Sequence, residues 1–159
     1  MVLRRTSVIL GLAFVVAGCF QSSGKSNINL GLVEPCSWLR IQDVRRIIGP
    51  NVGVGAPNPH FPQCSFDYTS ATGIRTDLVV GYGEVTAQSI RSFTLPNHRN
   101  QVVENLGDHA VFLEAASLDD GNNIILVVAS HNRSLLIGGE FLNLDQAKQL
   151  AALVIAKWT

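Results

Sequence analysis

The first residues of the chain, up to Cys19, differ in character from the rest of the sequence, which must form the folded part. Two arginines near the start give this stretch a positive charge, residues 7–16 are almost wholly apolar, and two small residues precede Cys19. This pattern is typical of a secretory signal peptide. The apolar run is shorter than the roughly 20 residues that span a bilayer. The sequence therefore predicts a signal peptide over residues 1–18 and a mature chain that starts at Cys19.

The four residues Val16-Ala17-Gly18-Cys19 resemble a bacterial lipobox. In a signal of this kind the cysteine is acylated on sulfur, the signal is cleaved before it, and the new amino group is often acylated too. We therefore expect Cys19 to be the site of lipid attachment. Two or three acyl chains anchor a protein stably, since each buried methylene contributes about 0.8 kcal/mol and one chain alone binds marginally. An ordinary cleaved signal and a single N-terminal membrane helix are the alternatives.

The mature chain divides into a polar tether and a folded region. Gln, Ser, Gly, Lys and Asn dominate the stretch up to Asn29, a composition that favours a flexible linker. We expect a lipidated tether over residues 19–33 and a single domain over residues 34–159. The lipid would place this domain at the cell membrane on its extracytoplasmic side, or at the outer membrane or its periplasmic face in a bacterium with two membranes.

The charge of the mature chain bears on its partners. Without the two arginines of the signal, ten basic residues face twelve acidic ones, which gives a net charge of −2. A near-neutral domain lacks the basic surface that nucleic-acid binding requires, so we expect no nucleic-acid partner. It also lacks the juxtamembrane cluster of four to eight basic residues that would indicate recognition of anionic lipid.

Two cysteines remain once Cys19 is assigned to lipid. Cys36 and Cys64 form an even pair in a compartment where disulfides persist, so a bond between them is the leading interpretation. A redox or metal pair is the alternative, although the two cysteines are not in a C-x-x-C arrangement and no His lies beside them at ligand spacing.

Hydrophobic periodicity and turn residues indicate an α+β domain. Apolar residues at helical spacing follow Ser37, a candidate N-cap, as far as Ile48, and Asn143 with Gln146 forms a near capping box before a second apolar stripe. Residues 94–101 are predicted to be an exposed loop, and 102–103 is an additional candidate for a short strand. In chain order the expected elements are a helix after Ser37, strands at 64–69 and 75–82, a helix at 86–93, strands at 110–114, 123–130 and 133–138, and a terminal helix after Asn143.

The expected order is therefore α-β-β-α-β-β-β-α. Antiparallel hairpins with helices gathered on one face give a two-layer α+β domain. The strand at 123–130 is continuously apolar, which indicates a central strand covered on both faces, or on one face plus a partner.

Several short motifs resemble a group of small actinobacterial cell-envelope lipoproteins of uncharacterised function. Their members have a lipobox, a tether, a Pro-Cys motif before a helix that ends in Leu-Gly, a second Cys that begins a strand, a Gly-Leu-Gly-Asp-x-Ala turn and a terminal helix. This chain departs from them at Arg40, where a Thr is frequent, and at Asn105, where a Gly is frequent. The resemblance implies a Cys36–Cys64 disulfide and an α+β fold, and it supplies no activity. The matching segments are Glu34–Leu39, Ile47–Gly49, Gln63–Phe66, Asn105–Ala110 and Ala147–Lys157.

Catalytic and metal motifs are weak throughout the sequence. No Gly-x-Ser-x-Gly elbow occurs, and Asp108-His109 is the most tempting pair, although adjacent side chains usually point apart and Asp108 is expected to brace the Gly107 turn through its own backbone. We therefore name no catalytic residue, no metal ligand and no cofactor, and we leave the ligand-binding residues open. The four histidines lie in expected loops, more than four residues apart: His60, His98, His109 and His131.

The sequence thus favours a lipid-anchored envelope protein that is not an enzyme and that binds or senses a partner. The membrane is the expected contact through the lipidated N-terminus, with an envelope protein or a small ligand as a further partner. The alternatives are an envelope hydrolase whose site is assembled from loops and a carrier of lipid or another apolar ligand. Any functional assignment that rests on the fold alone would be analogy.

Overall fold

The computed structural model describes residues 34–69, 73–83, 87–92, 98–115, 123–140 and 142–158. The chain divides into two compact units, Met1–Leu30 and Gly31–Thr159, and the described residues all belong to the second unit. The predicted signal peptide, the lipid attachment site at Cys19 and the tether lie outside the described residues.

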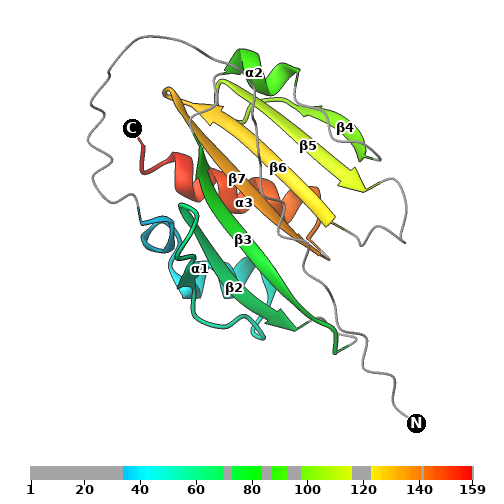
Figure 1. The fold of residues 1–159 in the computed structure, drawn as a ribbon. Helices are drawn as coiled ribbons and strands as arrows, with labels where there is room; N and C mark the ends of the chain where they lie inside the picture. Colours follow the sequence, from blue (N-terminus) through cyan, green and yellow to red (C-terminus); the bar gives the residue numbers. More distant parts are fainter. Residues whose placement is uncertain are drawn as a thin grey trace. The chain divides into compact units, whose positions relative to one another are not determined.

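An antiparallel sheet of seven strands forms the centre of the described unit (Figure 1). The strands lie in the order β1-β2-β3-β7-β6-β5-β4. Together with three α-helices this sheet confirms the α+β class. The strands are β1 Ala56–Pro57, β2 Gln63–Thr69, β3 Arg75–Gly83, β4 His98–Val103, β5 His109–Ala115, β6 Asn123–Ser130 and β7 Arg133–Glu140.

Two hairpins predicted from the sequence are present and meet in the middle of the sheet. β2 pairs with β3, β6 pairs with β7, and the strands β3 and β7 join the two hairpins, with Val80 opposite Ile137. His131 and Asn132 connect β6 to β7 with φ angles of 52° and 59°. Two consecutive residues with positive φ are the requirement of a type I′ turn, so the prediction of a two-residue connection is confirmed.

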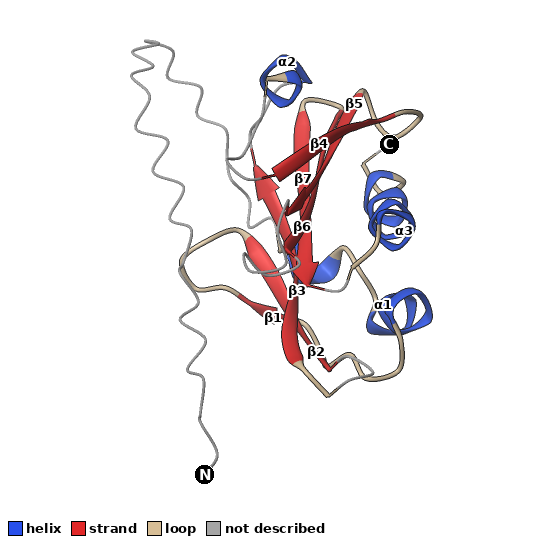
Figure 2. Cartoon of the chain, turned by 90° about the vertical axis from the view of Figure 1, so that its right-hand side faces the viewer, coloured by secondary structure: helices blue, strands red, loops and turns tan. Residues whose placement is uncertain are grey.

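Helices cover both faces of the sheet, not one face as predicted (Figure 2). α1 (Ile41–Ile48) and α3 (Leu144–Ile155) lie on one face, where the larger core cluster forms. α2 (Ala87–Arg91) packs its Ile90 on the other face. Both faces need cover because the apolar residues of β6 alternate between them. Leu126 and Val128 belong to the larger cluster, and Val127 and Ala129 pack with Ile90.

Three other predictions need correction. The first helix begins at Ile41 and not after Ser37, because Pro35–Ser37 forms a 3-10 turn, η1, before it. Residues 98–103 form β4 where a loop was expected over 94–101, and β1 is an additional strand within the expected loop at 49–63. With these strands the order becomes α-β-β-β-α-β-β-β-β-α, one strand more in each half than predicted.

The terminal helix α3 agrees with its sequence signals. The Asn143 side chain accepts a hydrogen bond from the backbone N–H of Gln146, and the Gln146 side chain accepts one from Asn143, which completes the capping box. The Gln146 side chain also donates to the carbonyl of Ile47 at 3.2 Å and so links α3 to the end of α1. None of the described helices is both long and apolar enough to cross a membrane.

Candidate functional site

Three aromatic rings and two cations meet at one end of the described unit. Trp38 lies edge-on to Tyr82, with ring centroids 6.0 Å apart, and edge-on to Trp158, with centroids 5.7 Å apart. The Arg133 guanidinium lies 5.9 Å from the centroid of the Trp158 ring, and the Lys157 ammonium donates to the backbone carbonyl of Trp38. We call these five residues the aromatic–basic cluster.

The elements around the cluster explain how residues so distant in sequence come together. Tyr82 shares its face of β3 with buried Val80, because alternate side chains of a strand point the same way. Arg133 begins β7 directly after the His131-Asn132 turn, and Trp158 follows the end of α3. The Lys157 ammonium bridges from α3 to η1 through the carbonyls of Ser37, at 3.4 Å, and Trp38.

The cluster combines apolar packing with exposed charge. Trp38 and Trp158 are partly buried against the larger core cluster, and Tyr82 is also partly buried. Arg133 and Lys157 are exposed. Edge-to-face rings of this spacing attract one another, and a guanidinium over an indole face adds a cation–π contact. The cluster can therefore contact a surface that offers both apolar groups and negative charge.

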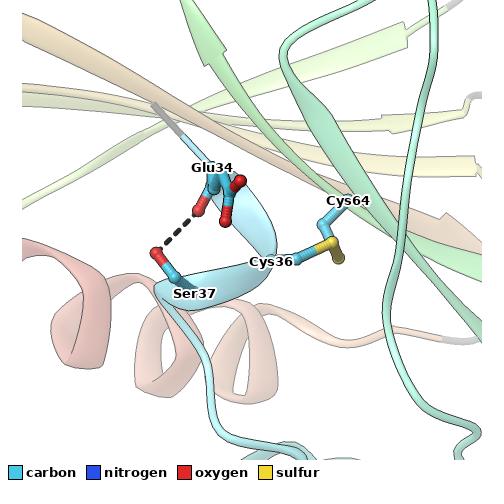
Figure 3. The surroundings of a disulfide bond; sticks show 4 residues. All are labelled: Glu34, Cys36, Ser37 and Cys64. Atoms are coloured by element: carbon cyan, nitrogen blue, oxygen red, sulfur yellow. Dashed lines mark hydrogen bonds between the residues drawn. A yellow bond between two sulfur atoms is a disulfide. The ribbon is translucent and has the colours of Figure 1, made fainter. Parts of the chain in front are cut away.

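A disulfide holds this end of the chain to the sheet (Figure 3). Cys36 in η1 is bonded to Cys64 in β2, with Cα atoms 4.9 Å apart, which confirms the predicted pair. Cys64 is fully buried. Gly55 passes so close to this bond that a Cβ on it would lie 2.6 Å from the Cys64 sulfur. The disulfide therefore fixes η1, and with it Trp38 two residues further on.

A second group of polar residues surrounds the β6–β7 turn. The hydroxyl of buried Ser130 lies 2.9 Å from Nδ1 of His131. The Asp108 carboxylate accepts the backbone N–H of His131 at 3.0 Å, so it braces the hairpin turn and not, as expected, the Gly107 turn. Asp108 is bonded to the main chain and not to the imidazole, and it is therefore not placed to orient that ring as the acid of a catalytic triad would.

Asp108 and His109 have separate surroundings in the structure. His109 pairs with Ala129 on the face that carries α2, and its Nε2 is buried with no hydrogen-bond partner among the described residues. The Asp108 carboxylate instead accepts the backbone N–H of His131 in the β6–β7 turn. In the part of the chain that the structure describes, no three His, Cys, Asp or Glu side chains lie together as metal ligands.

An acidic pair lies at the far ends of β2 and β3. Asp67 and Asp77 are directly opposite in the register, and Arg75 forms an ion pair with Asp67. The hydrogen bond and the charge of Arg75 lower the pKa of Asp67 below its ordinary value. Burial raises the pKa of Asp77, and the adjacent Asp67 raises it further. The pKa values of the two carboxyl groups are therefore shifted in opposite directions, downward for Asp67 and upward for Asp77.

A hollow of about 370 Å³ opens between β5, β6 and the start of α3. Its volume falls within the range of small-ligand sites, roughly 300–1,000 Å³. Its wall carries one carboxylate, that of Glu114, which is exposed. The remaining lining residues are mostly apolar: Phe112, Ala115, Ile124, Leu142, Asn143 and Leu144.

Comparison of the chain with protein-family models, with curated proteins and with solved structures finds no match. The resemblance to actinobacterial lipoproteins therefore stays a prediction. The described residues themselves show one feature that sequence reasoning missed. Trp38 is one of the apolar residues that follow Ser37 at helical spacing in the sequence, and only the folded chain brings it beside Tyr82 and Trp158.

Proposed function

We propose that the mature chain is a lipid-anchored lipoprotein of the cell envelope that acts as a binding module and not as an enzyme. The observation that carries the binding role is the aromatic–basic cluster, because Trp, Tyr and Arg side chains are enriched where proteins bind partners. The anchor rests on the lipobox pattern at Cys19. The Cys36–Cys64 disulfide supports an oxidising compartment.

The anchor is tested on the full chain produced in a bacterium that processes lipoproteins. We expect the wild-type chain to fractionate with membranes, and its mature N-terminus to carry the mass of two or three acyl groups. The variant Cys19→Ala should lose both properties because it lacks the acceptor sulfur. A wild-type chain without acyl mass would overturn the proposal.

A matched control separates the anchor from the other cysteines. The double variant Cys36→Ala/Cys64→Ala removes the disulfide and leaves Cys19 in place. We expect it to keep the acyl mass and the membrane fractionation. Loss of acylation in this variant would show that processing depends on the folded domain and not on the lipobox alone.

A carrier of a small apolar ligand is the second candidate function, and the hollow beside the start of α3 is the observation that favours it. Native mass spectrometry of the purified full chain tests it. A bound lipid or small molecule that disappears in the variant Ile124→Asp, which places a charge in the wall, would favour the carrier. A chain free of ligand would leave the binding module as the function.

A further inference from the structure

We infer that β4 pairs with β4 of a second copy of this chain, antiparallel and about a two-fold axis, so that two sheets join edge to edge. The inference concerns a different surface from the aromatic–basic cluster. It uses the proposed lipid anchor only as the means that brings copies of the chain together.

The two edges of the sheet differ in how well they are protected. β4 is the outermost strand beside β5 (Figure 1), and β1 forms the other edge. β1 has two residues, one of them Pro57, which has no N–H to offer a further strand. One more residue separates Val52 from Ala56 than separates Ser65 from Tyr68, so the register beside β1 is irregular. Short length, proline and an irregular register are devices by which proteins block pairing at a sheet edge.

β4 carries none of these devices. Its six residues, without proline or glycine, pair with β5 in one unbroken register from His98 to Val103. Residues 99–102 are all exposed, and Arg99 is the charged side chain among them. Val102 is apolar and 61% exposed. Because alternate N–H and C=O groups of an edge strand point away from the sheet, a regular and exposed edge is a template for a further strand.

The charges of β4 select the register of the pairing. A two-fold axis that runs through the sheet keeps each face on its own side, so opposite residues must share a face. The register centred on Gln101 places the two Arg99 side chains four positions apart, roughly 13 Å along the strand. A register centred on Asn100 would place them diagonal to one another on one face, where like charges repel. With Gln101 at the centre, Glu104, which follows β4, lies opposite His98 of the second copy.

The exposed valine gives the contact an apolar part. Val102 lies on the face that carries α2, because it pairs with Val111 of the smaller core cluster. In the register centred on Gln101, Val102 of one copy is diagonal to Val102 of the other, and each valine shields the other from water. A register centred on Val102 would leave half of β4 opposite the turn that follows it, and so would lose main-chain hydrogen bonds.

The length of the contact sets its strength. A six-residue strand is about 20 Å long, and pairing along it covers less than the roughly 800 Å² per partner of a stable interface. The pairing is therefore weak between free domains. Copies held on one membrane by the proposed lipid anchor meet at a high effective concentration, which favours a weak contact.

A thiol at the centre of the paired strands measures this contact. Opposite residues of an antiparallel pair have Cα atoms about 4.5–5.5 Å apart, which is within the range of a disulfide. The full chain with Gln101→Cys, purified from bacterial membranes and reconstituted into phosphatidylcholine vesicles, is oxidised, and its dimer fraction is measured on a non-reducing gel. The natural cysteines do not compete, because Cys36 is bonded to Cys64 and Cys19 is proposed to carry lipid. We expect about tenfold more dimer than from the control Gln149→Cys, at an exposed position of α3.

Further variants test the register and the contact. Arg99→Cys should form little dimer, because its two thiols would lie four positions apart. Addition of Val102→Lys to the Gln101→Cys chain should lower the dimer fraction about fivefold or more, since two like charges then lie diagonal to one another. The matched addition Val54→Lys replaces a valine that is 75% exposed near the other edge and should change nothing. Circular dichroism and thermal unfolding report whether each variant remains folded.

The outcomes separate the pairing from the anchor. Equal dimer fractions from Gln101→Cys and Gln149→Cys in acylated chains would overturn the pairing and leave the anchor standing. Oxidation in the intact bacterium that joins the Gln101→Cys chain to a different protein would overturn the second copy as the partner.

A chain without acyl groups on Cys19 would overturn the anchor, and the pairing is then judged on the purified chain at about 1 mM, in the range of effective concentrations that tethering gives. Sedimentation that shows a dimer, and a monomer for the variant Val102→Lys, would support the pairing. A monomeric wild-type chain at this concentration would overturn it.

Discussion

At the scale of single residues, Asp77 is a carboxyl group whose ionisation opposes folding. Burial, and then the neighbouring Asp67, raise the pKa of Asp77 above its ordinary value of 3.8. The folded chain therefore holds this proton more tightly than the unfolded chain does. It follows that protonated Asp77 stabilises the folded chain. This stabilisation is fully present below pH 3.8 and is lost as the pH rises through the raised pKa.

The variant Asp77→Asn should therefore stabilise the protein at neutral pH. An Asn side chain can still donate to the Asp67 carboxylate and carries no charge. We expect a gain of about 0.5 kcal/mol at pH 7, small because the group is largely solvated. Thermal unfolding at pH 7 and at pH 3 measures it, and the gain should vanish at pH 3. A less stable variant at pH 7 would contradict the argument, and Glu104→Gln, which removes an exposed charge, is the control.

Asp67 responds to acid in the opposite direction. Its pKa is lowered by Arg75, so its stabilising contribution is present above pH 3.8 and is lost as the pH falls through the lowered value. The variant Arg75→Gln should weaken the dependence of stability on pH in the acid range. Equal acid unfolding curves for this variant and wild type would show that the ion pair contributes nothing.

Gly107 is required both by its backbone angle and by the space around it. Its φ is +64°, and a Cβ would collide with the carbonyl oxygen of Ala129 and lie 2.8 Å from Cγ1 of Val128. We expect Gly107→Ala to destabilise by about 2–4 kcal/mol, the sum of a left-handed backbone and overpacking. Urea unfolding measures the loss.

Gly73 supplies a matched control for the backbone term alone. Its φ is +79°, and nothing lies within 4 Å of an added Cβ. Gly73→Ala should therefore cost only about 1–2 kcal/mol. Equal losses in the two variants would mean that contact with Ala129 contributes nothing at Gly107.

At the scale of elements, the disulfide between η1 and β2 links stability to the candidate site. Closing a loop of this length stabilises by roughly 3.6 kcal/mol in the chain-entropy model. We expect the double variant Cys36→Ser/Cys64→Ser to lose roughly this much free energy of unfolding and to change its tryptophan fluorescence, because Trp38 lies two residues from Cys36. Reductant should reproduce both effects in wild type and have none on the variant. An unchanged emission spectrum would show that other contacts hold Trp38.

The elements that were predicted correctly carry their signals locally. The capping box of α3 and the His131-Asn132 turn are read from residues within a few positions of one another. β4 was missed because its side chains are mostly polar and exposed, so that pairing with β5 and not burial defines it. The face that α2 occupies was missed because a five-residue helix with Ile90 as its buried residue gives little periodicity.

The candidate site shows the same division between local and distant signals. The Cys36–Cys64 bond could be predicted because the expected compartment and the cysteine count leave few choices. The aromatic–basic cluster could not, because its members come from β3, from β7 and from the residues just after η1 and α3. Only the pairing of β3 with β7 brings Tyr82 and Arg133 to the same end. The Asp108 contact with the backbone of His131 joins residues 23 apart and has no counterpart in the local pattern.

At the scale of the whole molecule, the strand order makes the described unit depend on distant contacts. β3 and β7 lie side by side in the middle of the sheet although more than 50 residues separate them, with Leu78 opposite Gly139. α3 then covers the face that both hairpins share and packs its Val154 in the larger core cluster. Neither hairpin can bury its apolar face alone, so we expect the unit to fold and unfold as one.

This expectation gives a test that spans the molecule. A chain that starts at Asn27 omits most of the first unit and keeps all of Gly31–Thr159, so it should fold and show a single cooperative transition in urea. Tryptophan fluorescence reports the cluster end, and far-ultraviolet circular dichroism reports the sheet as a whole. Coincident curves would establish one cooperative unit. A fluorescence transition at lower urea would instead show that η1 and the end of α3 detach first, and the aromatic–basic cluster would then be the least stable part of the fold.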